Sequence, residues 1–268
     1  MPILVAAGVI LYGFPDDTAE LWAWPINPPL TALAIGGGYL SGAVFFARAL
    51  RADRWHTMAL GLPAATVLTT LLLVATILHW QLFNHDHVAF WAWLVVYLVT
   101  PVLLPALWLF NRRRDPGPGT PPGPVVPGWA RTLVAAAGAG QLVVALIFFV
   151  RPSLAERYWP WPLSPLTART LSAFLAFIAV LLLGFAIERR WTALRLLVDS
   201  AALGLALVGV GVVRAYGDLT ASTPGRIAFL VVLAGYVLGL IAIRLTVRDP
   251  TRHDRSATPS NDQPVSRR

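Results

Sequence analysis

The stretch "WPWPLSPLTAR" at residues 159–169 lies between two long apolar runs, and "WAWPINPPLTA" at residues 22–32 lies between two others. Each copy places two tryptophans and several prolines ahead of Leu-Thr-Ala, which opens the next apolar run. Two such unusual phrases at corresponding places indicate that the chain repeats a larger unit.

Composition assigns the chain to a membrane. Of its 268 residues 57% are apolar and only 13% are charged, whereas a soluble domain carries about a quarter charged residues. The net charge of +8 comes from arginine alone, without lysine, which is typical of a GC-rich bacterial genome. We expect no nucleic-acid partner, because the arginines follow a membrane topology. With no cysteine, the chain has no disulfide, no Cys-ligated metal and no thiol nucleophile.

Eight apolar runs define an all-α integral membrane protein. Seven are long enough to cross a hydrocarbon core of ~30 Å. They are Leu30–Leu50, Thr57–His79, Val88–Phe110, Thr132–Val150, Leu166–Ile187, Trp191–Val213 and Ile227–Leu245. The eighth, Pro2–Phe14, spans only ~20 Å as a helix. It lacks the basic start of a signal peptide. In the self-alignment Met1 matches Gly138, whereas the corresponding run begins near Thr132, so we expect the natural chain to begin upstream of Met1.

The arginines predict the orientation. Sixteen of the 21 fall in alternate connections and the C-terminal tail, and five fall in the other connections. The positive-inside rule places the richer set in the cytoplasm. We therefore predict a multi-pass protein of the bacterial plasma membrane with both termini cytoplasmic. Tryptophans near the predicted ends of the runs suggest aromatic belts at the two membrane surfaces.

Self-comparison indicates an internal duplication. At an offset of 137, Trp22 and Trp24 align with Trp159 and Trp161; past the extra Pro29 the offset is 136, and Trp55 aligns with Trp191. Each half contains an even number of crossings, so the halves are parallel four-helix repeats. The predicted units are 1–112, the first repeat with a short first helix; 113–128, a Pro/Gly-rich cytoplasmic linker; 129–246, the second repeat; and 247–268, a disordered cytoplasmic tail.

The repeated phrase has two interpretations. In the first it starts a helix: Asn27 and Ser164 act as N-caps, and the following prolines take the first helical position. In the second, the two phrases form a groove in the outer leaflet for a lipid or sugar headgroup. The residues of that predicted groove are Trp22, Trp24, Trp159, Trp161 and Arg169.

The second copy also resembles a motif of uncharacterised actinobacterial membrane proteins, W-x-W-P-L-(S/T)-P-L-T-A-R. Trp159 to Arg169 match it, and Trp22 to Ala32 match it more loosely. The resemblance covers about a tenth of the chain. It implies a polytopic bacterial membrane protein and no particular activity.

Two polar clusters are candidates for chemistry. His79, His85, Asp86 and His87 lie at the outer end of the third run, and imidazole with carboxylate is a ligand set for Zn²⁺ or Cu²⁺. The alternative is that this short loop binds no metal, since H-x-H alone fixes no coordination geometry.

The second cluster lies inside a predicted membrane run. Asp199 is ~12 Å into its helix, where a carboxylate suggests a proton relay. Arg195 precedes it by one turn, so structural pairing of Asp199 with Arg195 is the alternative.

No motif names a reaction. The leading hypothesis is that the protein binds or transports a lipid-like or small apolar molecule at the outer-leaflet junction of the repeats. One alternative is a non-catalytic subunit of a membrane or envelope complex. The other is a membrane enzyme that uses the outer histidines. The expected partners are the bilayer, such a ligand, and in the subunit hypothesis another membrane protein.

Overall fold

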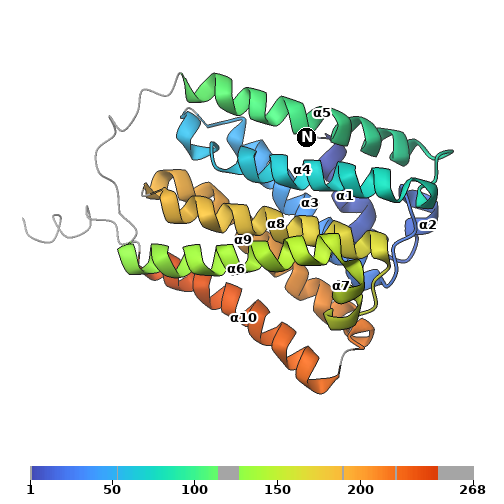
Figure 1. Ribbon diagram of the computed structural model, residues 1–268. Coiled ribbons are helices and arrows are strands. Elements are labelled where there is room, and N and C mark those ends of the chain that lie inside the picture. Colours follow the sequence, from blue (N-terminus) through green and yellow to red (C-terminus); the bar gives the residue numbers. More distant parts are fainter. Residues whose placement is uncertain (1, 53, 114–126, 189, 221, 247–268) are drawn as a thin grey trace, which may run out of the picture.

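The computed structural model describes residues 2–52, 54–113, 127–188, 190–220 and 222–246, and its elements are helical throughout (Figure 1). Most of the predicted linker and all of the predicted tail lie outside these residues. The elements are α1 Pro2–Gly13, α2 Thr18–Leu21, α3 Pro29–Ala49, η1 Trp55–Thr57, α4 Gly61–Leu78, η2 Trp80–Leu82, α5 Val88–Arg112, α6 Gly128–Val150, α7 Pro152–Tyr158, α8 Pro165–Ile187, α9 Trp191–Arg214, η3 Tyr216–Asp218 and α10 Thr223–Thr246.

Seven of these helices are long and apolar enough to cross a membrane, which confirms the seven long runs. They are α3, α4, α5, α6, α8, α9 and α10. The remaining apolar helix, α1, has 12 residues and is ~18 Å long, well below the thickness of a hydrocarbon core. An eighth crossing at α1 therefore stays a prediction.

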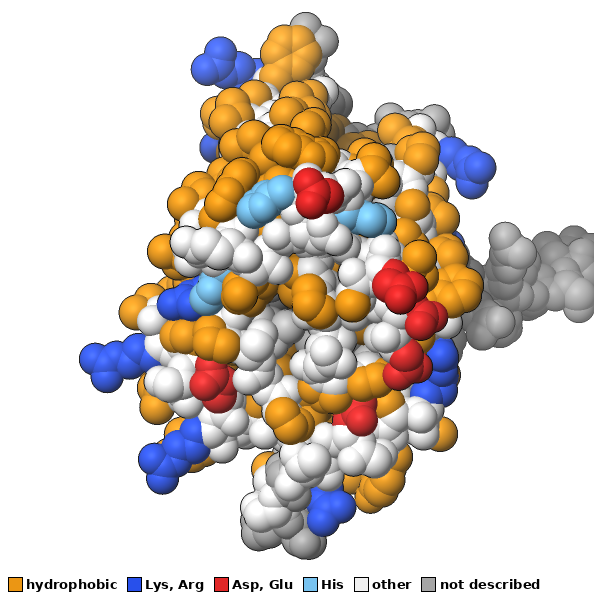
Figure 2. All heavy atoms as spheres, turned by 90° about the vertical axis from the view of Figure 1, so that its right-hand side faces the viewer, with side chains coloured by type: hydrophobic (Ala, Val, Ile, Leu, Met, Phe, Trp, Pro, Cys, Tyr) orange, Lys and Arg blue, Asp and Glu red, His pale blue; other side chains and the backbone are white. Residues whose placement is uncertain are grey.

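The long helices run side by side and define two ends of the molecule. The short helices α2 and α7 lie at one end, on the right in Figure 1, which we call the α2–α7 end. α5 ends and α6 begins at the opposite end, which we call the linker end. Figure 2 shows that acidic and His side chains gather on the α2–α7 end, with apolar side chains around its rim. The flanks match a lipid environment: no residue in the spanning window of α10 is buried.

Helices of one predicted repeat pack against helices of the other. α1 packs on α3, and α6 packs on α8, so the corresponding pairs form in each half. The central contacts cross between the halves, because α3 packs on α9 and α8 packs on α4. This reciprocal arrangement is what two parallel repeats related by a two-fold axis would produce, and it places two similar helix crossings side by side.

Small residues bring these helices close together. A methyl group on Gly36 of α3 would lie 2.8 Å from the backbone nitrogen of Tyr12 in α1. At the two central crossings, a methyl group would lie 3.2 Å from Leu33 at Gly211 and 3.1 Å from Leu60 at Gly184. Close backbone approach at small residues is the usual packing of membrane helices, where van der Waals contact drives association.

The repeated phrase starts α3 and α8 in different ways. At α8 the prediction agrees with the structure: Ser164 is the N-cap, its hydroxyl accepts from the Thr167 backbone N–H at 3.3 Å, and Pro165 opens the helix. At α3 the prediction that Asn27 is the N-cap is wrong, because Pro28 occupies the N-cap position and provides no side-chain hydrogen bond. The missing acceptor comes from the far end of the chain, where Asp218 accepts from the Leu30 N–H at 2.9 Å.

Candidate functional site

The tryptophans of the repeated phrase lie in the interior of the protein. Trp22, Trp24 and Trp161 are only 5%, 2% and 3% exposed, and Trp159 packs against the same core. The ring centroid of Trp24 lies 4.8 Å from that of Trp93 and 5.1 Å from that of Phe83. The structure thus places these indoles in a packed aromatic cluster, where they line neither of the two pockets described below.

One of these indoles joins the two predicted repeats. Trp161 donates its Nε1–H to the hydroxyl of the buried Thr31, at 2.8 Å. The donor belongs to the second copy of the phrase and the acceptor to the first. Part of the phrase therefore packs between the two predicted repeats.

Arg169, the fifth residue of the predicted groove, is already engaged. Its Nε–H donates to the carbonyl of Phe149 at the end of α6, at 3.1 Å, and its Nη1 lies 2.6 Å from Nε2 of His79. A guanidinium at a helix C-terminus is favoured by the helix dipole. Because a guanidinium can only donate, Nε2 of His79 is the acceptor in this contact. Burial and the adjacent guanidinium lower the pKa of His79.

This pair predicts a pH-dependent stability. Because the folded pKa of His79 lies below its unfolded value, the unfolded chain binds more protons, and stability falls as the pH drops from about 7 through the folded pKa. We expect the melting temperature in detergent to decline between pH 7.5 and 5. In His79→Gln, which keeps an acceptor, the decline should be smaller. An equally steep decline in that variant would contradict the role of His79.

The predicted metal cluster does not assemble. His87 accepts from the Ala89 N–H through Nδ1 at 3.1 Å and so caps α5, while the ring of His85 packs against Trp80 and Phe90. Together with the contact of His79 to Arg169, these positions separate the imidazoles. Within the described ranges no three His, Asp or Glu side chains are grouped so that they could hold a metal ion. The predicted Zn or Cu site thus gains no support from the geometry.

Asp199 has different partners from the one predicted. Its Oδ2 accepts from Nη1 of Arg48 on α3 at 3.1 Å, and its Oδ1 forms an ion pair with Arg244 on α10. Arg195 is exposed and takes part in none of the ion pairs among the described residues. The partners come from other helices because the Asp199 carboxylate lies within reach of arginines near the C-terminal ends of α3 and α10.

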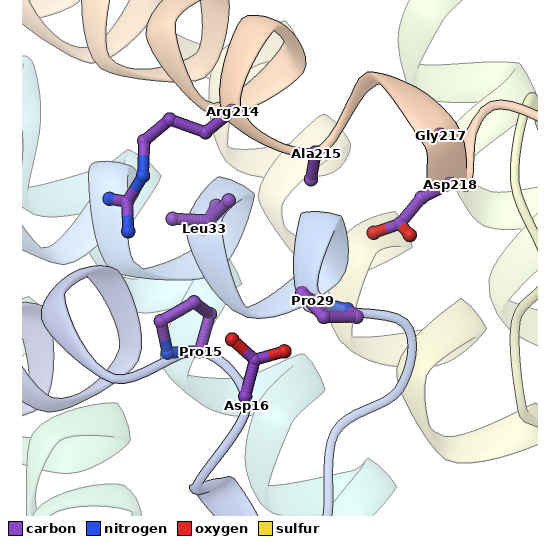
Figure 3. Close-up of a pocket in the computed structure, with 8 residues that line it drawn as sticks. All are labelled: Pro15, Asp16, Pro29, Leu33, Arg214, Ala215, Gly217 and Asp218. Atoms are coloured by element: carbon purple, nitrogen blue, oxygen red, sulfur yellow. The ribbon is translucent and has the colours of Figure 1, made fainter.

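A pocket of about 340 Å³ opens at the α2–α7 end, between α3 and α9 (Figure 3). We call it the Asp16 pocket. Figure 3 shows the carboxylates of Asp16 and Asp218 and the guanidinium of Arg214 directed toward a common space above Pro29 and Leu33. Its lining residues are Pro15, Asp16, Pro29, Leu33, Arg214, Ala215, Gly217 and Asp218.

Two of its charged groups are held in place by the fold. Arg214 donates from Nη1 to the Tyr12 carbonyl at 2.8 Å, at the C-terminal end of α1, and its guanidinium lies 5.4 Å from the centre of the Tyr12 ring. Asp218 is fixed by the N–H of Leu30. Asp16 is exposed and appears in no ion pair among the described residues. The pocket therefore presents one cation and two anions on a largely preset frame.

The sequence offset suggests why the Asp16 pocket lies at the α3–α9 crossing. Leu33 aligns with Arg169, and Tyr12 aligns with Phe149. At the α4–α8 crossing the long Arg169 side chain reaches the Phe149 carbonyl and His79. At the α3–α9 crossing Leu33 is too short to do so, and Arg214 approaches the Tyr12 carbonyl from α9 instead. The space that Arg169 occupies in one half is open to a ligand in the other.

Sequence reasoning missed Asp16 and did not bring Arg214 and Asp218 together with it. Asp16 lies about 200 positions before Arg214 and Asp218 and belongs to the other predicted repeat, and each of the three by itself resembles an ordinary surface charge. The available signal was a difference between the two aligned halves of the sequence: Leu33 aligns with Arg169, and Asp16 aligns with Ser153.

Comparison with known proteins does not assign the site. No protein-family model, no curated protein and no solved structure matches the chain.

Proposed function

We propose that the protein binds the polar head of a lipid-like molecule in the Asp16 pocket, at the junction of the two repeats. The helix packing supports this position, because α1 and α3 belong to the first predicted repeat and α9 and η3 to the second. In the proposed topology the α2–α7 end faces outward and carries the arginine-poor connections. The pocket then lies at the outer surface of the bacterial plasma membrane.

The charges of the pocket indicate the chemistry of the head. Arg214 suits a phosphate or carboxylate, since a guanidinium offers two parallel donors to such a group. Asp16 and Asp218 suit an ammonium group. The volume of about 340 Å³ falls at the lower end of the range for small-molecule sites. A zwitterionic head that carries an amine and a phosphate, such as that of phosphatidylethanolamine, meets these requirements.

The observation that carries the proposal is the open pocket with opposed charges at one of two similar crossings. The neighbouring surface suits an attached hydrocarbon chain, because the spanning helices expose apolar side chains along their flanks. The proposal concerns binding; net transport of the bound molecule would require a further change in structure.

The test is retention of phosphatidylethanolamine by purified protein, measured by native mass spectrometry. Arg214→Gln together with Asp16→Asn should reduce the lipid-bound fraction at least tenfold, since each substitution removes a charge-assisted contact. Asp17→Asn is the matched control, because Asp17 is exposed beside the pocket and does not line it. Phosphatidylcholine, with a methylated amine that cannot donate, should bind more weakly. Equal retention by the double variant and the parent would contradict the proposal.

A further inference from the structure

A second pocket lies at the opposite end of the same crossing. It encloses about 200 Å³ at the linker end, where α3 finishes and α9 begins. We call it the Asp199 pocket. Its lining residues are Arg48, Ala52, Thr57, Thr192, Arg195, Leu196 and Asp199. The function proposed for the Asp16 pocket does not depend on this one, and the reverse also holds.

Arginine exceeds carboxylate in this pocket. Asp199 is the single acid among the lining residues, and two guanidinium groups, those of Arg48 and Arg244, already share it. Arg195 adds a third guanidinium at the pocket wall and belongs to no ion pair among the described residues. Glu188, a carboxylate nearby in sequence, is bound by Arg190 through Nε at 2.9 Å and Nη2 at 2.8 Å. Asp53 lies outside the described residues.

This excess of positive charge favours an anion. Asp199 is only 17% exposed, whereas the Arg48 side chain is 50% exposed and Arg195 lies at the surface, so water screens the arginines in part. The guanidinium groups nevertheless outnumber the carboxylate at the pocket, and an anion is the counter-charge that would balance them. Arg48 and Arg195 approach the pocket from different helices, and Thr192, whose hydroxyl lies 3.3 Å from Nε2 of His56, also lines it. Guanidinium and hydroxyl groups are preferred partners of phosphate oxygens.

The corresponding place at the other crossing carries no charge. At the offset of 136, Arg48 aligns with Gly184, Arg195 with Ala59 and Asp199 with Pro63. There a methyl group on Gly184 would contact Leu60 at 3.1 Å, so apolar packing fills the space. The arginine-rich pocket therefore belongs to the α3–α9 crossing, and the aligned positions of the α4–α8 crossing do not reproduce it.

We propose that the Asp199 pocket binds a phosphate group through Arg48, Arg195 and Thr192. The group is supplied either by the head of an anionic phospholipid or by free inorganic phosphate. In both cases the phosphate neutralises the guanidinium groups that Asp199 leaves uncompensated.

Binding to delipidated protein distinguishes the two sources. One arm measures the affinity for inorganic phosphate in detergent by calorimetry; the other measures retention of phosphatidylglycerol against phosphatidylcholine by native mass spectrometry. If the source is a lipid head, the protein retains phosphatidylglycerol, and its affinity for inorganic phosphate is at least tenfold lower than its affinity for phosphatidylglycerol. If it is free phosphate, the calorimetric arm gives saturable binding and phosphatidylglycerol shows no preference over phosphatidylcholine.

The assignment of residues is tested in whichever arm shows binding. Arg195→Gln should weaken binding about tenfold, the expected loss of one charge-assisted contact, and Thr192→Val should weaken it to a lesser degree. Arg113→Gln is the matched control: it removes an exposed arginine at the same end that does not line the pocket. Arg195→Gln should fold normally, because its side chain forms none of the described ion pairs. Equal losses in Arg195→Gln and Arg113→Gln, or no binding in either arm, would overturn the proposal.

Discussion

Replacing Asp199 by Asn is expected to lower the stability of the protein by about 2 kcal/mol. The substitution keeps the size of the side chain but leaves the guanidinium groups of Arg48 and Arg244 without their shared carboxylate. Removing one partner of a buried ion pair costs about 3–5 kcal/mol. We expect less here, because the two arginine side chains are 50% and 43% exposed and solvent screens them in part.

The measurement is thermal unfolding in detergent, in phosphate-free buffer, since an anion in the Asp199 pocket would offset the loss. Arg195→Gln separates the two assignments of the partner. If Asp199 pairs with Arg48 and Arg244, Arg195→Gln should change stability by no more than about 0.5 kcal/mol. Adding Arg48→Gln to Asp199→Asn should cost less than the sum of the single losses, because the two side chains contact each other. Additive losses, or a large loss in Arg195→Gln, would show that the pairing is wrong.

Replacing Trp24 by Ala is expected to cost more, about 3–5 kcal/mol. The indole is 2% exposed and packs against Trp93, Phe83 and Trp22. The loss does not require a hydrophobic effect in the bilayer, because the side chains that surround the indole lose their van der Waals contacts with it.

Trp129→Ala is the control for this measurement. Trp129 begins α6 at the linker end and is 62% exposed, which is the environment of an interfacial anchor. Its truncation should change the melting temperature by a small fraction of the effect at Trp24. Similar small shifts for both variants would mean that Trp24 is an anchor at the membrane surface, as the belt interpretation of the sequence held, and that the aromatic cluster contributes little.

The elements of the fold were predictable from local signals. The apolar run Leu166–Ile187 became α8, which begins one residue earlier at Pro165, and Trp191–Val213 became α9, which ends one residue later. Such boundaries depend on neighbouring residues alone: a proline in the first turn, a hydroxyl before it, and an apolar run long enough to cross a bilayer. The division into two repeats, which matches of Trp and Pro along the chain suggest, stays a prediction.

The candidate site was not predictable in the same way. Three of the tryptophans chosen from the phrase are buried in the aromatic cluster, and the predicted partner of Asp199 is the nearest arginine in sequence rather than the ones in contact. An i,i+4 rule finds Arg195 because it looks along one helix, whereas Arg48 lies 151 positions away. Likewise, Asp218 caps α3 from 188 positions away.

The sequence by itself determined a helical membrane protein with seven long apolar helices and the approximate limits of those helices, although α4 begins four residues later and α6 four residues earlier than the apolar runs predict. Only the tertiary structure decided which helix faces which, and hence that both pockets lie at the α3–α9 crossing. The physical reason is that these helices are apolar on nearly all sides. In a soluble helix a polar face marks solvent and an apolar face marks the core. Here lipid and protein interior select the same residue types, so the partner of each face depends on the fit of surfaces far apart in the chain.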